Sequence, residues 1–397
     1  MIAPSHAFDI ARARRETRAA EQIVHFNNAG AALMPIAVSA ALHEYLRLEE
    51  RWGGYETAER QAATLARFYE AAAALLHCDA DEIAFAENAT RAWDMAFYGF
   101  RFQPGDRILT TLAEYGSNVI AYLHRVRRCG VELVFVPDDE WGQIDVRALE
   151  RLIDERVKLI SISHIPTGGG LVNPAAEVGR LARAAGIPFL LDACQSIGQM
   201  PLDVHEIGCD ILSGTGRKYL RGPRGTGLLY VRREMIERLE PPLVDQHAAT
   251  LLSEDRYALK SDAARFEGWE CNFAGKAALG AAIDYAREWD LAVIQSRITV
   301  LADRLRGRLA DVDGVTVTDR GRQRCGIVTF TARQRSPADI KHALSRRSIN
   351  VSVSSGSGSL VSFRRRGLDA VVRASVHYYN TEAEIDFLIE ALQQTLG

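Results

Sequence analysis

Several features that define other protein classes are missing from this sequence. Its six cysteines are scattered, with no CxxC pair and no Cys/His spacing of a metal site, which argues against a disulfide framework or a bound metal. The first 22 residues mix acids with bases and lack an apolar core, so they do not form a secretory signal. The longest apolar helical run, AAAALL at 71–76, is too short to span a bilayer. We therefore expect a cytoplasmic protein with no membrane partner and no metal.

A strong net charge is also missing. The formal net charge is -3 over 397 residues, which gives no reason to expect nucleic acid as a partner. A chain of this length, 47% hydrophobic, has enough residues for one large or two moderate domains with a well-buried core. The group of cations at 217–224 is therefore a local feature that needs a local explanation.

Strand-like and helix-like segments alternate from about residue 24 to 235. Near-continuous apolar strands between amphipathic helices predict an α/β fold with a mostly parallel sheet covered on both faces. The expected strands are IVHFNN, DEIAFA, RILTTL, VELVFVP, KLISISHI, PFLLDA and GLLYV, and the expected helices include 57–77, 88–99 and 175–186.

The order of the expected helices and strands changes after about residue 275. A long helical stretch at 275–310 precedes the β-like runs VTVT, GIVTFTA, NVSVS and VVRASVHYY and a closing helix at 381–395. We predict an N-terminal arm at 1–25 that packs on the small domain, a large domain at 26–270, and a smaller α+β domain at 271–397.

Unusual residues follow several of the predicted strands, where sites form in parallel α/β sheets. ENATRAW at 87–93 opens a helix, and its backbone N–H groups suit a phosphate, although Asn88 or Thr90 could simply be an N-cap. Tyr115 in AEYGSN could stack on a flat ligand or be a partly buried loop tyrosine. Asp192 ends the apolar strand of LLDACQS, where a carboxylate is costly unless it meets a cation or donors; capping the next helix is the alternative.

The stretch SGTGRKYLRGPRGTGLLYV at 213–231 holds the local cations and five glycines. It matches neither GxxxxGK[ST] nor GxGxxG, and a lone lysine in a basic loop is usually solvated. Lys218, however, follows small residues and precedes an apolar strand. Desolvation beside other cations lowers the pKa of a lysine toward nucleophilic use.

Together these residues are the parts needed to bind pyridoxal phosphate. A lysine can hold the cofactor covalently, an aspartate can keep its ring nitrogen protonated, and an aromatic residue can stack on the ring. A helix N-terminus, Thr215 and Arg217 can hold the phosphate. Arg373 lies inside the apolar strand VVRASVHYY, where a substrate carboxylate or an internal acid would have to satisfy it.

These motifs, from FNNAGAALMP at 26–35 to YNTEAEID at 379–386, resemble the class V aminotransferase family of fold-type I pyridoxal phosphate enzymes. That family also includes cysteine desulfurases. The most specific parts are Asp192 with Gln195, the TGRK loop with GPRGTG, and RASVHYYNT. The pattern is nearest to the branch of hercynylcysteine sulfoxide lyase-like and isopenicillin N epimerase-like proteins.

The resemblance implies a role for each matched residue. Lys218 would bind the cofactor, Asp192 would pair with the ring nitrogen, and Gln195 would contact the phenolic oxygen. Tyr115 stands where many members have a stacking histidine. The phosphate would be held by Ala89, Thr90, Thr215 and Arg217, and the substrate by Arg373 and Asn28.

The resemblance also implies a homodimer. Glu270 stands where members have a threonine that reaches the neighbouring subunit's phosphate, and its carboxylate would repel that phosphate. Arg221, Arg224 and the arginines at 364–366 could bind an acidic part of the substrate, although 364–366 fits a solvated surface better.

One departure from the family pattern bears on the reaction. Cysteine desulfurases carry a nucleophilic cysteine shortly before the carboxylate-binding arginine, whereas 350–372 contains no cysteine. Cys194 is expected to be a small buried core thiol. Persulfide-forming desulfuration is therefore not expected. The prediction is a lyase that breaks a C–S bond by β-elimination and releases pyruvate and ammonia. The alternatives are an aminotransferase, an epimerase and a non-catalytic binding protein.

Overall fold

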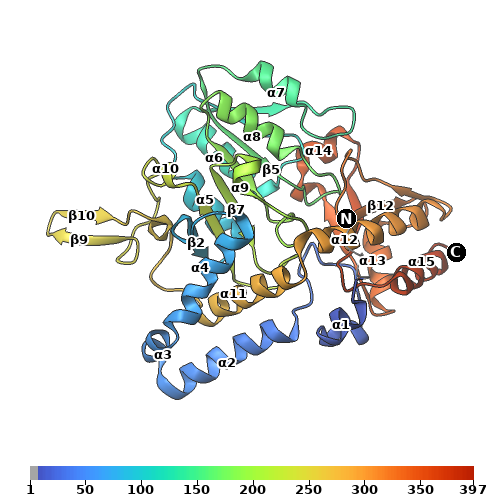
Figure 1. Cartoon of the computed structure of the whole chain (residues 1–397). Coiled ribbons are helices and arrows are strands. Elements are labelled where there is room, and N and C mark those ends of the chain that lie inside the picture. The colour runs from blue at the N-terminus through green and yellow to red at the C-terminus, as the bar shows by residue number, and fades with distance from the viewer. Residues whose placement is uncertain (1–7) are drawn as a thin grey trace, which may run out of the picture.

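The computed structural model describes residues 8–397, and its centre is a seven-stranded sheet in the order β2-β8-β7-β6-β5-β3-β4 (Figure 1). Strand β8 runs antiparallel to both of its neighbours, and the other strands share one direction. The expected mostly parallel α/β sheet is therefore confirmed. The strands are β2 (Ile83–Ala86), β3 (Arg107–Thr111), β4 (Glu132–Val136), β5 (Val157–Ser163), β6 (Phe189–Asp192), β7 (Ile211–Thr215) and β8 (Gly227–Val231).

Helices cover both faces of this sheet because its strands are apolar on both faces. Successive residues such as Leu190 and Leu191 belong to two separate hydrophobic cores. Helices α5 and α6 pack in one core and α4 and α8 in the other. The helices of this part are α2 (Ile36–Trp52), α3 (Gly54–Arg60), α4 (Ala62–Leu76), α5 (Ala89–Phe97), α6 (Gly116–Cys129), α7 (Val146–Leu152), α8 (Ala175–Ala184), α9 (Val204–Ile207), α10 (Arg233–Ile236) and α11 (Phe273–Glu288).

A second sheet, of four strands, is built from the C-terminal part of the chain. Its order is β11-β12-β15-β14, and all its neighbours are antiparallel. Its strands are β11 (Val315–Val317), β12 (Ile327–Ala332), β14 (Ser352–Ser355) and β15 (Ala370–Ser375). The helices of this part are α12 (Leu291–Ala310), α13 (Pro337–Ser345), α14 (Leu360–Arg365) and α15 (Glu382–Leu396).

Some expected elements differ from the structure. The helix expected at 57–77 is divided at Gln61 into α3 and α4. The run IVHFNN forms only β1 (Val24–His25), which pairs with β13 (Ile349–Asn350) and not with the large sheet. A strand this short is defined by its partner, which its own sequence does not reveal. The long helix expected at 275–310 is two helices, α11 and α12, because Asp290 has a φ of 62° and caps α12 through Ala292 N–H.

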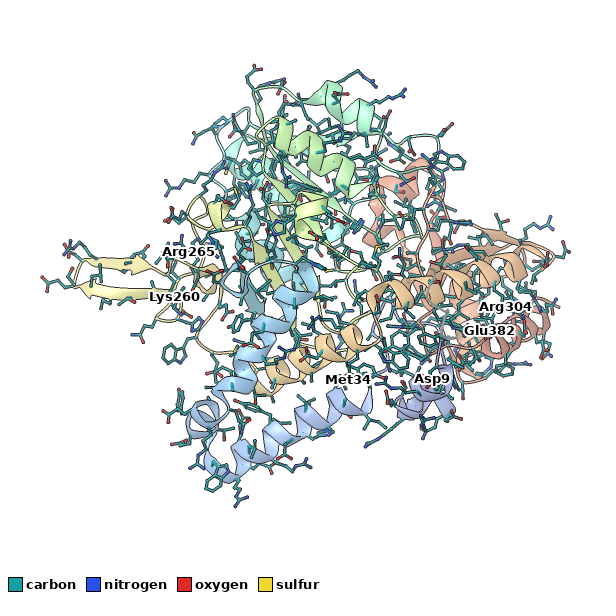
Figure 2. All side chains as sticks on the ribbon, viewed as in Figure 1. Asp9, Met34, Lys260, Arg265, Arg304 and Glu382 are labelled. Atoms are coloured by element: carbon teal, nitrogen blue, oxygen red, sulfur yellow. The ribbon has the colours of Figure 1, made fainter. Side chains whose placement is uncertain are left out.

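Other parts of the chain lie at the edges of the molecule. Helix α1 (Ile10–Arg15) contacts the C-terminal helix through an ion pair of 2.7 Å between Arg14 and Glu384. A hairpin of β9 (Ala249–Ser253) and β10 (Arg256–Leu259) projects from the body, and Lys260 lies near its base (Figures 1 and 2). Among residues 8–397, no helix is long and apolar enough to cross a membrane. The predicted domain boundaries stay predictions; residues 1–7 of the predicted arm lie outside the described part of the chain.

Candidate active site

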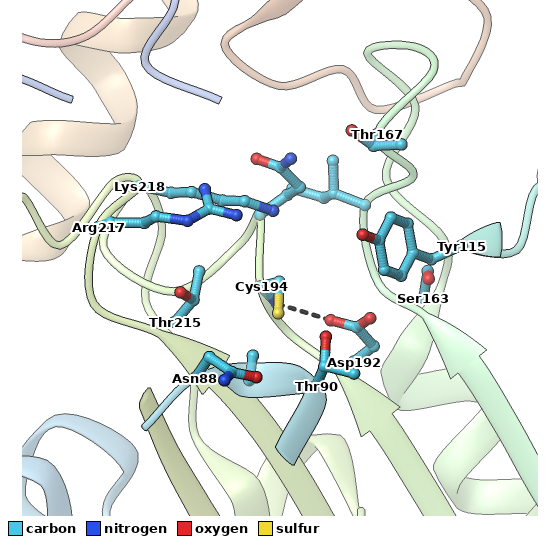
Figure 3. A pocket seen from close by; sticks show the side chains of 13 residues that line it. Asn88, Thr90, Tyr115, Ser163, Thr167, Asp192, Cys194, Thr215, Arg217 and Lys218 are labelled. Atoms are coloured by element: carbon cyan, nitrogen blue, oxygen red, sulfur yellow. Dashed lines mark hydrogen bonds between the residues drawn. The ribbon is translucent and has the colours of Figure 1, made fainter. Parts of the chain in front are cut away.

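A pocket opens where the parallel strands of the large sheet end. The loops after β2, β3, β5, β6 and β7 each contribute to its wall (Figure 3). Because these strands share one direction, their carboxyl ends meet at one edge. The lining residues are Asn88, Ala89, Thr90, Tyr115, Ser163, Ile165, Thr167, Asp192, Cys194, Gln195, Thr215, Arg217 and Lys218. Eight predicted cofactor residues, from Ala89 to Lys218, are thus brought together.

The N-terminus of α5 forms one wall of the pocket. Asn88 caps this helix by accepting a hydrogen bond of 2.9 Å from the N–H of Arg91, so the capping interpretation is correct. Ala89 and Thr90 in the first turn still face the pocket. Gly227 lets β8 approach this turn, because a Cβ there would lie 2.8 Å from the backbone carbon of Asn88. The wall can therefore bind an anion at the positive end of a helix.

Lys218 is half-buried, with its amine inside the pocket (Figure 3). Burial lowers the pKa of this amine to about 8, and the positive charges of Arg217 and Arg373 act in the same direction. Cys194 and Asp192 oppose that shift. An amine with such a pKa is neutral often enough near pH 7 to attack an aldehyde.

Asp192 stands at the end of β6 and is 7% exposed. Its Oδ1 accepts from the backbone N–H of Cys194 at 2.9 Å, and its Oδ2 accepts from Nδ2 of Asn118 at 3.0 Å. These donors hold the carboxylate in one orientation and leave it room for one more bond, which suits a protonated ring nitrogen.

Tyr115 and Arg217 lie on opposite sides of the pocket mouth (Figure 3). Tyr115 is 36% exposed and turns its ring toward the pocket, in keeping with the stacking role. Arg217 donates from Nη1 to the carbonyl of Gly30, so part of its guanidinium is already engaged by the N-terminal segment. Thr215 is buried at the end of β7.

Arg373 on β15 of the C-terminal sheet contacts the lining residue Thr167 but does not itself line the pocket. It is 7% exposed, and its Nη1 donates to the hydroxyl and the carbonyl of Thr167 at 2.6 and 3.2 Å. Its Nε is buried without a hydrogen-bond partner, and no carboxylate forms an ion pair with it within residues 8–397. Burial lowers the pKa of Arg373. The internal acid proposed as an alternative is thus not found in this part of the chain, and a ligand carboxylate would satisfy the guanidinium.

Two predicted site residues, Asn28 and Gln195, use their side-chain amides in hydrogen bonds inside the protein. The side chain of Asn28 is used inside the protein: its Nδ2 donates to the carbonyl of Ser375 at 2.7 Å and its Oδ1 accepts from the hydroxyl of Tyr379. It does not line the pocket, so the structure gives no support to a substrate contact by Asn28. Gln195 does line it; Nε2 donates to the carbonyl of Ala29 at 3.1 Å, and Oε1 is buried without a partner.

Five pocket residues are absent from the predicted binding set; one of them, Asn88, was considered only as a helix cap. Ser163, Ile165 and Thr167 follow β5, and the strand prediction for KLISISHI already placed this loop at the correct edge of the sheet. Cys194 was expected in the core, but it is half-buried and lines the pocket, because the chain turns toward the cavity after Asp192.

The remaining cations and Glu270 do not line the pocket. Arg221 is buried, with a φ of 59°, and binds the carbonyl of Leu33 and the hydroxyls of Thr17 and Tyr378. Arg224, Glu270, Arg364 and Arg365 are exposed, and Arg366 is half-buried and bonded to the carbonyl of Thr318.

The pocket fits pyridoxal phosphate. It combines an amine of lowered pKa, a fixed carboxylate, an aromatic ring and a helix N-terminus, and its lining residue Thr167 accepts from the buried guanidinium of Arg373, whose Nε has no partner. This set is typical of a pyridoxal phosphate enzyme.

Comparison with known proteins identifies the family. The family model for Aminotransferase class-V matches residues 24–388, and the chain belongs to this family. Its cofactor is pyridoxal phosphate. The chain is 32% identical to a "Probable cysteine desulfurase" of Methanothermobacter thermautotrophicus, over 97% of each chain. It is 30% identical to one of Halalkalibacterium halodurans, over 94% of this chain and 93% of the other.

The chain is also similar to solved structures of cysteine desulfurases. An apo cysteine desulfurase of Thermococcus onnurineus matches with a TM-score of 0.91 and 26% identity, over 99% of each chain. The cysteine desulfurase CsdA of Escherichia coli matches with a TM-score of 0.91 and 25% identity, over 98% of this chain and 99% of the other.

These relatives contradict the predicted reaction. Proteins similar to this chain over nearly their whole length are named cysteine desulfurases, so both the pyruvate-releasing lyase and the exclusion of persulfide-forming desulfuration are wrong. The error was to treat a missing loop cysteine as evidence against the reaction. Desulfuration requires a thiol that accepts sulfur, but that thiol does not have to belong to the same chain.

Proposed function

We propose that this protein is a pyridoxal phosphate enzyme that removes sulfur from cysteine. The observation that carries the proposal is the unpaired guanidinium of Arg373 beside the pocket that holds the Lys218 amine. A charged carboxylate site beside a reactive amine suits a small α-amino acid. The names of the relatives favour cysteine among such amino acids.

Each pocket residue has a role in this proposal. Bound pyridoxal phosphate supplies an electron sink for negative charge at Cα of the amino acid. Asp192 holds the proton on the ring nitrogen, and Tyr115 stacks on the ring. Arg373 fixes the carboxylate, so that the Cα proton faces the amine of Lys218, which takes and returns that proton. The N-terminus of α5 binds the phosphate together with the side chains of Thr90, Thr215 and Arg217.

The sulfur needs an acceptor. As the Cβ–Sγ bond breaks, the electron pair stays on Cβ, which gains a proton; the product is alanine, and the accepting thiolate becomes a persulfide. We place this acceptor outside the chain. Burial, and to a lesser degree Asp192, raises the pKa of the Cys194 thiol well above its usual value, so little of it is thiolate at neutral pH. The segment 350–372 offers no cysteine.

The test is product analysis with the holoenzyme, L-cysteine and an excess of dithiothreitol. We expect alanine and sulfide in equal amounts, and none from Lys218→Ala. Cys194→Ala should form alanine within a few-fold of the wild-type rate. Complete loss in Cys194→Ala, with the cofactor still bound, would show that the acceptor is inside the chain.

We also propose that the protein is a cytoplasmic homodimer. The exposed apolar side chains of the projecting hairpin support an interface: Leu251, Leu252 and Tyr257 are 72%, 59% and 55% exposed. The cysteines, which are all free, support a reducing compartment. Light scattering after size exclusion should give twice the chain mass of 43.9 kDa, and a monomer at micromolar concentration would contradict the dimer.

A further inference from the structure

A buried amide joins two buried carboxylates behind the pocket. Asn118 on α6 donates through Nδ2 to Oδ2 of Asp192 and to Oε1 of Glu114, both at 3.0 Å. Glu114, Asn118 and Asp192 are 2%, 4% and 7% exposed. Because one amide nitrogen carries two hydrogens, Asn118 can make both bonds at once and is held in one orientation between the acids.

Glu114 carries many hydrogen bonds but no cation. No lysine, arginine or histidine within residues 8–397 forms an ion pair with it. Burial, and to a lesser degree Asp192, raises the pKa of Glu114 to about 7, while its hydrogen bonds act in the opposite direction. The donors are the hydroxyl of Thr110, the N–H of Tyr115, the amide of Asn118, and the N–H and hydroxyl of Ser163. These donors bind both oxygens of the carboxylate, and above about pH 7 the group carries its negative charge within this network.

We propose that Glu114 and Asn118 are positioning residues, which hold Asp192 in place and add negative charge that favours a proton on the cofactor's ring nitrogen. The inference rests on the proposed pairing of Asp192 with that nitrogen. Asn118 and the N–H of Cys194 each bind one oxygen of Asp192, so the carboxylate cannot rotate away. Glu114 directly precedes the stacking Tyr115 in the sequence. Its negative charge stabilises the positive charge on the ring nitrogen that pairs with Asp192.

Other charged and titratable groups face this network. The Lys218 amine is next to Arg217 and the Cys194 thiol, and Arg373 reaches it from β15. Tyr122 on α6 faces Glu114, and its own pKa is raised well above the usual value by burial and by that carboxylate. These groups are left intact in the variants below.

The test uses Glu114→Gln and Asn118→Ala in the holoenzyme, with the visible absorption of the bound cofactor followed against pH. Glu114→Gln removes a negative charge, which destabilises the protonated, cationic cofactor. The pH at the midpoint of the change in cofactor absorption should therefore fall by about one unit. Asn118→Ala should shift it in the same direction by less. The double variant should shift it at least as far as Glu114→Gln, because the charge of Glu114 and the bond from Asn118 to Asp192 are then both lost.

The matched control is Glu267→Gln. Glu267 is also buried and hydrogen-bonded, to Tyr69 and the N–H of Phe85, but it bonds neither Asp192 nor Asn118 and lies 3.8 Å from the amine of Lys276. Glu267→Gln should lower the melting temperature and leave the pH midpoint of the cofactor absorption unchanged. If Glu114→Gln and Asn118→Ala lower only the melting temperature, the two residues are merely structural and the inference is overturned.

The outcomes separate this inference from the proposed function. Cysteine is not used, so the midpoint is measured whether or not sulfur is released. If Glu114→Gln does not fold, Asn118→Ala decides alone, since Glu114 keeps its other donors there. An unchanged midpoint with a normal visible band overturns only this inference. A wild-type protein without that band overturns the proposed function, and this inference with it.

Discussion

The guanidinium of Arg373 is bonded to both the hydroxyl and the carbonyl of Thr167, at 2.6 and 3.2 Å. This pair joins the C-terminal sheet to the loop after β5, so the C-terminal part of the chain contacts the pocket wall through the lining residue Thr167. The bonds occupy Nη1, and Nε is buried without a hydrogen-bond partner. Thr167 therefore orients the guanidinium.

Arg373→Ala should weaken substrate binding while the cofactor stays bound. A charge-assisted pair is worth about 2–3 kcal/mol, so the KM for cysteine should rise roughly 100-fold. Thr167→Val, which removes only the hydroxyl acceptor, should raise it by much less. Steady-state kinetics with a cofactor absorption spectrum test this, and loss of the cofactor from Arg373→Ala would show that the residue is misplaced.

The amine of Lys218 should react with the cofactor aldehyde at unusually low pH. Its pKa of about 8 lies below the ordinary 10.5, so half of it is neutral near pH 8. An ordinary lysine would be about 0.3% neutral there. The rate at which the apoprotein gains its visible band should therefore rise with pH and level off above about 8. A rate that still rises steeply at pH 9.5 would contradict the assigned environment.

Tyr115→Ala should loosen the cofactor, whereas Tyr115→Phe should not. Ring stacking contributes roughly 1 kcal/mol, so the affinity of Tyr115→Ala for pyridoxal phosphate should fall about fivefold to tenfold. Equilibrium dialysis against the three proteins measures the effect. Equal affinities in all three would exclude stacking by this residue.

Arg221 should matter for stability. It is 1% exposed, its guanidinium binds Thr17, Leu33 and Tyr378, and it lies 4.5 Å from the ring centroid of Tyr379. Arg221→Ala removes these contacts from both ends of the chain and should lower the free energy of unfolding by about 3 kcal/mol. Urea denaturation tests this. The exposed Arg224→Ala is the matched control and should change it by less than about 0.5 kcal/mol.

The sequence predicts the large sheet and most of the pocket for one physical reason. Apolar strands that alternate with amphipathic helices favour a mostly parallel, covered sheet. The ends of the parallel strands meet at one edge, which brings Asp192 and Lys218 together although they lie 26 positions apart.

What the sequence could not predict depends on contacts between distant residues. Asn28 is hydrogen-bonded to Ser375 and Tyr379, and Arg373 is hydrogen-bonded to Thr167. These bonds join segments more than 200 residues apart. The break at Asp290 is a single left-handed residue with no sequence signature of its own. Asn118 likewise becomes meaningful only once Glu114 and Asp192 are known to lie on either side of it.

The fate of the carbon skeleton of cysteine tests the central claim most directly. The holoenzyme is incubated with ¹³C-labelled L-cysteine and dithiothreitol, and the products are identified by NMR. The account predicts labelled alanine equal in amount to the sulfide released, with no product from Lys218→Ala. Labelled pyruvate with an equal amount of ammonia, in place of alanine, would contradict it.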